Sequence, residues 1–306
     1  MAMEETKYIW KNGALVPWSE ATTHVLSHSL HYGSAVFEGL RCYYNKETDK
    51  SYVFRLKEHM DRLVRSAKMC LMDIPYTSDE LVEATLTTLR ENGLKEGYVR
   101  PLVYHGYGQM GVNPQGAPVE VIIACWPWGA YLGEDALANG IKVGVSSWRQ
   151  RSNNAIPPQM KASASYMNSI LAKLEAIEHG YSEAVMLNEQ GKVCEGTGEN
   201  IFVVRDGVLS TPPVSDGLLE GITRDSVLQI AFDLDIPVAE ESMVRADLYV
   251  ADEIFFTGSA AEVTPVGSVD DRVIGKPGPI TKAIQDRFFE ITAGKVEQYK
   301  DWLFEV

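Results

Sequence analysis

The sequence lacks the features of a secreted, membrane or metal-binding protein. No stretch approaches the ~20 apolar residues that a membrane-spanning helix needs, and residues 1–11 are polar and acidic, without the apolar core of a secretion signal. The four cysteines form no CxxC pair, and their spacing fits no zinc site. We therefore expect no metal, a cytoplasmic location and reduced thiols, three of them buried in apolar surroundings: Cys42, Cys70 and Cys125, with Cys194 on a strand.

An excess of positive charge is also missing. Lysine and arginine number 28 against 42 acidic residues, which gives a formal net charge of −14. This balance argues against nucleic acid or an anionic membrane as a partner, although a few local arginines could still bind an anionic substrate. Length (306 residues), apolar content (45%) and charged content (23%) fit a soluble globular protein of two domains or one large one.

The hydrophobic pattern predicts an α+β protein without the βαβ alternation of a Rossmann domain. Asn12-Gly13 predicts a hairpin between strands at 8–10 and 14–18. In the helix expected at 57–72, the apolar face would hold Met60, Leu63, Val64, Ala67 and Leu71. Further strands are expected at 35–44, 51–56, 98–105, 119–126, 141–147, 184–187, 192–194, 200–204, 208–210 and 253–258, and further helices at 78–92, 165–179, 223–235 and 277–292.

A proline- and glycine-containing segment at 127–133 interrupts this pattern and predicts a linker. We expect a smaller N-terminal domain over 1–127, a linker over 128–136 and a larger C-terminal domain over 137–306.

Lys161 stands alone between a Pro157-Pro158 turn and the small residues 162–165, and Tyr166 follows five positions later. A lysine can form a Schiff base with an aldehyde and then shuttle protons, and burial among small residues would favour its neutral form. Taken alone, the lysine fits a surface loop better, and the tyrosine could equally pack at a helix start; the surrounding pattern favours the Schiff-base role.

A carboxylate flanked by glycines opens the apolar segment 195–202. Together with a lysine and a tyrosine, a carboxylate completes the set of partners that pyridoxal phosphate needs, because it keeps the ring nitrogen protonated. Glu195 and Glu199 are the two candidates for this role, and it is the family resemblance given below that favours Glu195.

A phosphate-binding turn is predicted at 219–225. Gly221 lets the backbone approach an anion, and Thr223 could cap the helix that follows. The turn Gly258-Ser259-Ala260 offers further backbone N–H groups. Arg62 lies off the apolar stripe of its helix and could reach the phosphate, with Arg55 and Arg65 as alternatives, and the turn at 219–225 could also be an ordinary capped helix.

Tyr98 and Arg100 lie two apart on one strand and share a face. An arginine on an apolar strand is costly to bury unpaired, so it needs a carboxylate from the protein or from a substrate. The glycine-rich loop 106–114 could act as a lid. His24, His28 and His31 are expected to form hydrogen bonds rather than bind metal, because no carboxylate cluster accompanies them.

Together these segments resemble the branched-chain amino-acid aminotransferases, among the fold-type IV pyridoxal-phosphate enzymes. The resemblance covers nearly the whole chain. It rests on the segments 27–33, 36–41, 98–101, 110–114, the surroundings of Lys161, 195–202, 221–225 and 258–265. It implies a D-amino-acid aminotransferase-like fold with a small α/β N-domain and a larger pseudo-barrel C-domain. The implied reaction transfers an amino group between L-leucine, isoleucine or valine and 2-oxoglutarate, by a ping-pong route through an internal aldimine on Lys161.

The resemblance also implies residue roles. Lys161 would be catalytic, Tyr98 and the turn 259–260 would take the substrate α-carboxylate, and Arg100 would take the distal carboxylate of glutamate. Val112 would come from another subunit of a homodimer or of a larger oligomer, up to a hexamer. The implied pyridoxal 5'-phosphate contacts are Arg62, Lys161, Tyr166, Glu195, Gly198, Asn200, Leu219, Gly221, Ile222, Thr223, Gly258, Ser259 and Ala260. The implied substrate contacts are Tyr32, Phe37, Tyr98, Arg100, Val112, Trp128, Tyr131, Ser259 and Ala260.

Departures from the family pattern are few. Glu220 replaces a common proline, Ser259 replaces a frequent threonine, and residues 45–50 form an insertion. The alternatives are a D-amino-acid or (R)-amine aminotransferase or a lyase of the same fold, and a non-catalytic scaffold protein. Tyr98, Arg100 and the 110–114 loop argue against the first, and Lys161 with Tyr166 and Glu195 argues against the second.

Overall fold

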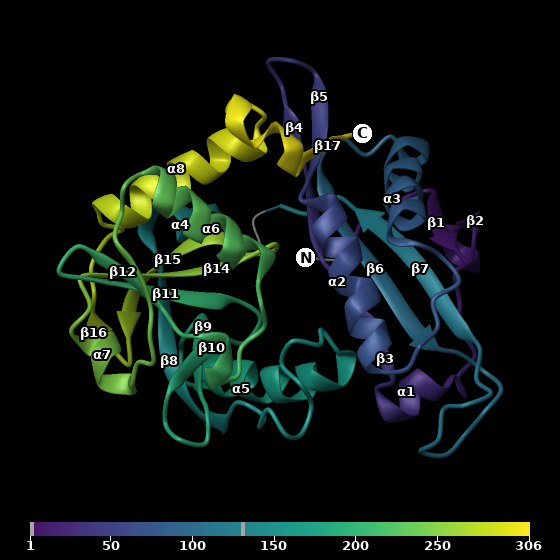
Figure 1. Cartoon of the computed structure of the whole chain (residues 1–306), viewed down its shortest axis with the longest axis horizontal. Helices are drawn as coiled ribbons and strands as arrows, with labels where there is room; N and C mark the ends of the chain where they lie inside the picture. The colour runs from purple at the N-terminus through teal and green to yellow at the C-terminus, as the bar shows by residue number, and fades with distance from the viewer. Residues whose placement is uncertain (1–2, 130–131) are drawn as a thin grey trace. The chain divides into compact units, whose positions relative to one another are not determined.

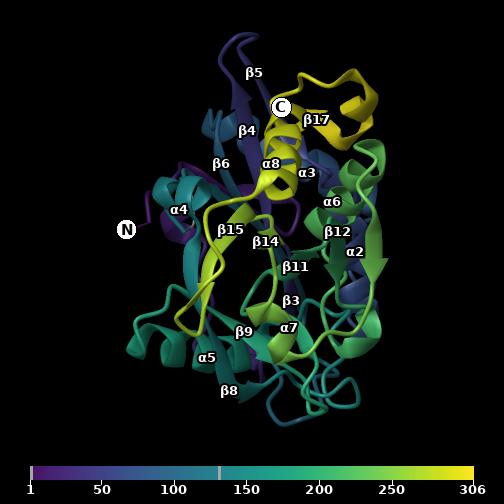
Figure 2. The same ribbon diagram turned by 90° about the vertical axis from the view of Figure 1, so that its left-hand side faces the viewer.

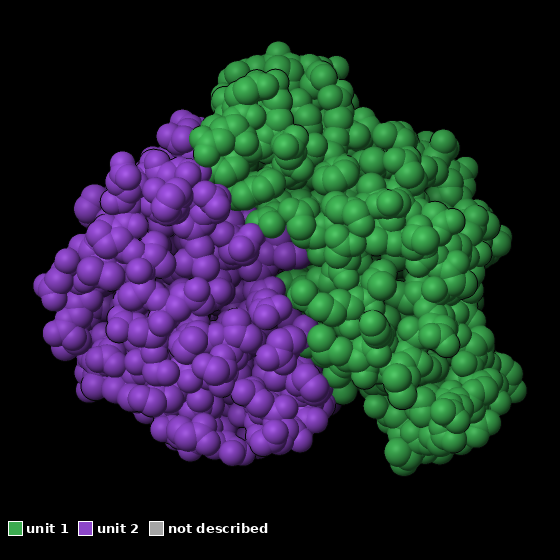
Figure 3. All heavy atoms as spheres, in the orientation of Figure 1, with its two compact units in different colours: residues 1–129, 160–164, 291–306 green, residues 130–159, 165–290 purple. Residues whose placement is uncertain are grey.

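The computed structural model describes residues 3–129 and 132–306 (Figure 1). The chain forms two compact units, coloured separately in Figure 3. Unit 1 holds residues 1–129, 160–164 and 291–306, and unit 2 holds residues 130–159 and 165–290. The domain boundaries expected from the sequence remain a prediction, and the contact pattern differs from them by grouping 160–164 and 291–306 with the N-terminal part.

Unit 1 is built on an eight-stranded antiparallel sheet in the order β17-β5-β4-β6-β7-β1-β2, with β3 also paired to β6. Helix α2 contacts β3 and β6, α3 contacts β1 and β7, and the two helices contact each other. The strands are β1 (Tyr8–Lys11), β2 (Ala14–Pro17), β3 (Ala35–Phe37), β4 (Leu40–Asn45), β5 (Lys50–Phe54), β6 (Gly97–His105), β7 (Val119–Trp126) and β17 (Leu303–Glu305); the helices are α1 (His28–Tyr32), α2 (Leu56–Met69) and α3 (Ser78–Asn92), with the 3-10 turns η1 (Trp18–Glu20) and η4 (Glu297–Trp302).

Local signals set much of unit 1. The hairpin prediction is confirmed, because Lys11 pairs with Ala14 and the two turn residues have positive φ, 49° at Asn12 and 94° at Gly13. Helix α3 begins with a capping box in which Thr77 and Glu80 bond each other's backbone amides.

Two local predictions in unit 1 were wrong. The strand expected at 35–44 is divided at Glu38-Gly39 into β3 and β4. Met60, Leu63 and Ala67 do line the buried face of α2, but Leu71 is 86% exposed. The helix ends at Met69 and Leu71 has a φ of 55°, so its side chain leaves the apolar stripe.

Unit 2 contains a nine-stranded sheet that closes on itself, as expected for the pseudo-barrel. The path runs β10-β9-β8-β15-β14-β11-β12-β13, and an additional β10–β11 pairing joins six of the strands into a ring. The strands are β8 (Ile141–Arg149), β9 (Glu183–Leu187), β10 (Val193–Gly196), β11 (Asn200–Arg205), β12 (Val208–Thr211), β13 (Val238–Glu240), β14 (Glu253–Gly258), β15 (Glu262–Val269) and β16 (Arg272–Val273).

Helices surround this sheet, and α5 contacts β8 and β9 (Figure 2). In the described ranges, no helix combines the length and the apolar character that crossing a membrane would require. The helices are α4 (Glu134–Asn139), α5 (Tyr166–Glu178), α6 (Ile222–Asp233), α7 (Arg245–Tyr249) and α8 (Pro279–Thr292), with the 3-10 turns η2 (Ser163–Ser165) and η3 (Val214–Asp216).

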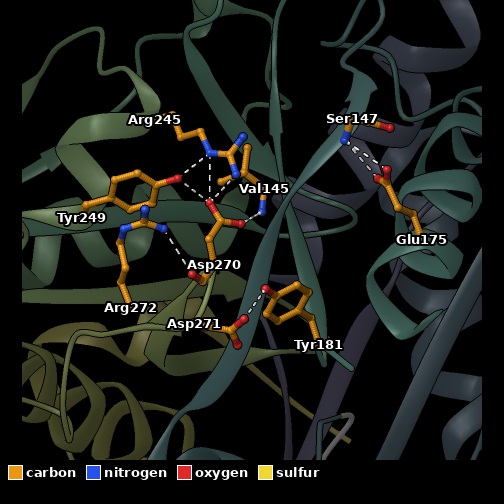
Figure 4. A network of polar contacts seen from close by, with 9 residues as sticks. All are labelled: Val145, Ser147, Glu175, Tyr181, Arg245, Tyr249, Asp270, Asp271 and Arg272. Carbon is orange, nitrogen blue, oxygen red and sulfur yellow. Dashed lines mark hydrogen bonds and ion pairs between the residues drawn. The ribbon is translucent and has the colours of Figure 1, made fainter. Parts of the chain in front are cut away.

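The carboxylate of Asp270 links strand β8 to helix α7 (Figure 4). It accepts from the Val145 amide of β8 at 2.8 Å, from Arg245 at 2.6 Å and from the Tyr249 hydroxyl at 2.6 Å. Burial alone would raise the pKa of Asp270, but these donors outweigh it and hold the pKa below its ordinary value. The guanidinium of Arg272 covers the Tyr249 ring at 4.0 Å, so two cations and an acid fasten α7 to the β15–β16 turn.

All four cysteines are free thiols. Burial raises the pKa of Cys42 to about 12 and that of Cys125 to about 11, so both stay protonated and unreactive. Cys194 is buried on β10 and donates to the Asp216 carbonyl at 2.9 Å. Cys70 was expected to be buried but is only half-buried, because it lies at the end of α2.

Candidate functional site

The backbone of Lys161 is fixed by unit 1. Its carbonyl accepts from the Phe37 amide at 3.1 Å, and its amide donates to the Ser66 hydroxyl at 3.3 Å. The next residue, Ala162, forms a β-bridge with Val36. The half-buried lysine side chain places Nζ 5.2 Å from the centre of the Phe37 ring. Strand β3 and helix α2 therefore hold the lysine from both sides.

Arg100 lies on the same aromatic surface. Its guanidinium is 4.6 Å from the centre of the Phe37 ring and 5.4 Å from that of Tyr98, and Nη2 is 3.5 Å from the Tyr98 hydroxyl. Its Nε is buried without a hydrogen-bond partner, and the described residues supply no ion pair to it. Trp128 meets the Tyr98 ring edge-on at 4.5 Å. We expected Arg100 to pair with a carboxylate from the protein or from a substrate. No carboxylate of the described residues is that partner.

Gly39 makes room for this tyrosine. A Cβ built on Gly39 would lie 1.8 Å from the Tyr98 hydroxyl, a distance that no side chain can accept. The Tyr98 hydroxyl therefore occupies the space next to Gly39, at the break between β3 and β4. The missing side chain of Gly39 lets this hydroxyl lie beside Arg100.

Arg62, expected at the phosphate, is held by a buried acid. Its Nε and Nη2 donate to the two oxygens of Glu38 at 2.7 and 2.9 Å, and His59 Nδ1 lies 2.7 Å from Glu38 Oε2. Burial would raise the pKa of Glu38, but Arg62 and His59 hold it well below its usual range, so Glu38 is ionised. Burial lowers the pKa of His59, which leaves this imidazole neutral.

Of the three arginines considered for the phosphate, Arg62 is the buried one. Arg55 lies over the Trp302 ring at 4.7 Å and pairs with Glu58, and Arg65 is exposed. No sequence signal identified Glu38, because its partners lie more than 20 positions away on α2.

Glu195, on β10 of unit 2, is held by three donors. Its Oε1 accepts from Gln150 Nε2 at 2.5 Å, and its Oε2 accepts from the Leu219 amide at 3.0 Å and from Asn200 Nδ2 at 3.3 Å. Asn200 also donates to the Leu219 carbonyl at 2.9 Å. Three predicted cofactor residues thus meet here. Gln150 was missed, because a single glutamine after a strand carries no recognisable pattern.

Glu199, the competing carboxylate, is buried and accepts from the Gly198 amide at 3.0 Å. Burial, followed by the negative charge of Glu183, raises the pKa of Glu199 to about 8. Glu183 itself is paired with Lys173 at 2.7 Å. Glu199 is therefore neutral at pH 7, and a neutral acid cannot be the ionic partner of a ring nitrogen, which favours Glu195.

The predicted phosphate turn starts a helix with an uncapped end. Gly221 is the N-cap of α6, and within residues 3–129 and 132–306 no side chain caps it, so Thr223 lies inside the helix and is not the cap that the sequence suggested. A Cβ on Gly221 would be 1.9 Å from Asn200 Oδ1, so only glycine fits. First-turn N–H groups without a cap suit an anion.

The second turn, 258–260, lies between β14 and β15, and Ser259 and Ala260 are half-buried. The adjacent Thr257 hydroxyl is buried, and no residue in the described part of the chain forms a hydrogen bond with it. Tyr166 is the first residue of α5 and is half-buried. An uncapped helix start, a buried orphan hydroxyl and a carboxylate held by donors fit a phosphorylated pyridine ring.

Loop 106–117 is fastened to α1 at Gly111. The Gly111 carbonyl lies 2.7 Å from His28 Nε2, and its amide donates to the Tyr32 hydroxyl at 3.2 Å. His28 Nδ1 is 2.7 Å from the Ser34 hydroxyl. Next to this clamp, Val112 is 88% exposed and Tyr32 44% exposed. Tyr131, also expected in the substrate pocket, lies outside the described residues.

Residues 35–269 match the family described as amino-transferase class IV. The chain belongs to this family. The aminotransferase is 47% identical to the branched-chain-amino-acid aminotransferase of Escherichia coli K12, over 100% of this chain and 99% of that one. Its fold is α+β fold-type IV, as predicted, and it matches the solved E. coli branched-chain aminotransferase with a TM-score of 0.95 over 98% and 99% of the two chains.

A solved T.th. branched-chain aminotransferase, complexed with N-(5'-phosphopyridoxyl)-L-glutamate, matches with a TM-score of 0.93 and 45% identity, over 98% of each chain. The aminotransferases of this class use pyridoxal 5'-phosphate, and this is the cofactor of the present chain.

Replacing Glu199 with glutamine tests the buried neutral acid. Because folding raises the pKa of Glu199 from 4.5 to about 8, the folded chain binds more protons than the unfolded chain at pH values between about 4.5 and 8. The wild type therefore loses stability as pH rises through this window, and Glu199→Gln removes that loss. We expect the variant to gain stability over the wild type from pH 4.5 upward and to level off above pH 8, measured by urea unfolding.

The matched control is Glu189→Gln, which removes the same charge from an exposed position. It should track the wild type at every pH. The difference in unfolding free energy between Glu199→Gln and the wild type should change with pH. If it stays constant between about pH 5 and 9, Glu199 is not a neutral acid at pH 7.

Proposed function

We propose that the chain transfers an amino group between L-leucine, L-isoleucine or L-valine and 2-oxoglutarate, in two half-reactions on one site in the cytoplasm. Relatives spanning the full chain carry the name branched-chain-amino-acid aminotransferase. The observation that supports this substrate pair most directly is Arg100, a half-buried cation on an aromatic wall, without a carboxylate partner among the described residues.

Such a site must accept an apolar side chain in one half-reaction and a carboxylate in the other. Phe37, Tyr98 and Trp128 supply apolar surface for a branched aliphatic chain. Arg100 lies against that surface, so the longer glutamate side chain would pass over the rings and place its carboxylate on the guanidinium. The cation–aromatic contacts keep the guanidinium in place during the half-reaction in which no carboxylate binds it.

The remaining site residues would hold and orient the cofactor. When bound, pyridoxal 5'-phosphate supplies an electron sink for the bond that breaks at the substrate Cα. Lys161 Nζ would attach the cofactor and then move the Cα proton, Glu195 would hold a proton at the ring nitrogen, and Tyr166 would donate to the ring oxygen. The phosphate would be held by Arg62 and by the turns at 221–223 and 258–260, with Gly198, Asn200 and Leu219 lining the ring.

We also propose that the chain works as a homodimer or a larger homo-oligomer. Helix α5 is apolar on two opposite faces: Ala172 and Ala176 are buried against the sheet, whereas a second stripe is open to solvent. A second copy of the chain would cover this stripe, and Val112 would enter that copy's substrate pocket. A sedimentation mass of a single 33.9 kDa chain would contradict this proposal. The stripe consists of Met167, Ile170, Leu174 and Ile177.

The function is tested by the absorption of the purified protein with pyridoxal 5'-phosphate. We expect a long-wavelength band that L-leucine and L-glutamate bleach and that D-alanine does not. Bleaching by D-alanine alone would move the chain to the D-amino-acid activity of the same fold. Borohydride reduction followed by peptide mass mapping should find the phosphopyridoxyl group on Lys161, and a label on another lysine would overturn the assignment.

Replacing Arg100 with alanine tests the shared pocket. A hydrogen bond to a charged group contributes about 1.5–3 kcal/mol, so the rate constant of the glutamate half-reaction divided by its KM should fall roughly 10- to 100-fold. The leucine half-reaction should change by less than about fivefold, because leucine brings no distal charge.

The matched control is Arg205→Ala, which removes an equally charged but exposed side chain. Single-turnover kinetics with each amino acid would give the values needed for both variants. Equal losses for leucine and glutamate in Arg100→Ala would contradict the role of Arg100.

A further inference from the structure

Glu195 is the residue proposed to address the ring nitrogen, and its orientation depends on a side chain that no sequence pattern marks. Gln150 is only 3% exposed and donates from Nε2 to Glu195 Oε1 at 2.5 Å. The contact joins residues 45 positions apart. Gln150 thus serves one carboxylate oxygen, whereas the other oxygen accepts from Asn200 and Leu219.

Hydrogen bonds hold both the backbone and the side-chain amide of Gln150. Its backbone N–H donates to the Leu187 carbonyl at 2.8 Å, directly after the end of β8. Its Oε1 accepts from Arg151 Nη1 at 3.3 Å. A guanidinium can only donate, and Glu195 in its proposed ionised role can only accept, so the amide has one arrangement that satisfies both neighbours.

Gln150 also separates two opposite charges. Arg151 reaches the amide oxygen of Gln150, and its Nε is buried without a hydrogen-bond partner among the described residues. A guanidinium in direct contact with Glu195 would neutralise the carboxylate and compete with a ring nitrogen for it. The neutral amide transmits a hydrogen bond and leaves the negative charge on Glu195.

We propose that Gln150 is a positioning residue for the aminotransferase reaction: it holds the Glu195 carboxylate in the orientation that keeps the cofactor ring nitrogen protonated. This inference rests on the proposed role of Glu195. Gln150 acts through Glu195, so its loss should change the electronic state of the ring more than the binding of the amino acid.

The experiment uses the holoenzyme loaded with pyridoxal 5'-phosphate labelled with ¹⁵N in the ring. Gln150→Leu keeps a side chain of similar size and removes the donor. We expect the ring-nitrogen resonance to shift toward that of Glu195→Gln, kcat for L-leucine to fall about tenfold, and KM to change less than about threefold.

Gln285→Leu is the matched control. Gln285 is also buried, at 5% exposure, but its Nε2 donates to the carbonyls of Leu137 and Val263 and, among the residues that the structure describes, to no ionised group. Its replacement should lower the unfolding temperature and leave the nitrogen resonance of the bound cofactor unchanged. A similar resonance shift in both variants would mean that the effect reports general loosening of unit 2, and would overturn the positioning role.

Gln150→Glu supplies a second readout at nearly unchanged volume. While the introduced carboxyl is protonated it can donate to Glu195 as the amide does, and once ionised it repels Glu195. We expect activity near the wild-type level at acid pH and a new alkaline loss that the wild type does not show. This profile remains measurable if Gln150→Leu fails to fold.

The outcomes separate the two proposals. If Glu195→Gln leaves the ring nitrogen unchanged, the role of Glu195 is wrong and that of Gln150 falls with it. If Glu195→Gln shifts the resonance while Gln150→Leu keeps both the wild-type resonance and the wild-type kcat, only the positioning role of Gln150 is overturned.

Discussion

The pairing of Glu195 with Asn200 across β10 and β11 is the interaction on which unit 2 depends. This single register closes six strands into a ring, and it also brings the carboxylate and the amide that share Leu219 as a partner. The tight turn between the two strands contains Glu199, and burial keeps that acid neutral. The pairing that closes the barrel therefore also brings together two of the residues proposed to contact the cofactor.

Two buried glutamates, Glu38 and Glu199, have opposite charge states because their neighbours differ. Glu38 is enclosed with a guanidinium and an imidazole, so it remains an anion in the core of unit 1. Glu199 is enclosed near another acid, so it keeps its proton. Glu183 is matched to Lys173 by a direct ion pair. The formal net charge of −14 consequently says little about these interiors, because neighbours set the local balance.

Sequence reasoning succeeded where the cause of a structure is local. Asn12-Gly13 forces a hairpin, and the helix expected at 78–92 is α3. Its start is set by the Thr77–Glu80 capping box, which acts within a few residues but was found only in the structure. The family motif also identified the residues at which cofactor contacts are expected. It could not identify Gln150 or Glu38, whose partners lie 45 and at least 21 positions away.

The same distinction explains the other failures. Strand β15 contains a proline and a glycine, which locally argue against a strand, yet pairing on both sides with β14 and β8 forms it. Thr223 looks like a cap in the sequence, but α6 begins one residue earlier, after a glycine that must approach Asn200. In each case a contact made in three dimensions overrides the local preference.

Residues 160–164 and 291–306 belong to unit 1. In the sequence, segments of unit 2 lie on both sides of 160–164, and a segment of unit 2 comes directly before 291–306. A gene fragment ending at residue 129 would encode neither Lys161 nor β17, the strand that completes the sheet beside β5. No single cut yields either unit whole. A single recombination crossover therefore cannot exchange one unit intact and leave the other unchanged.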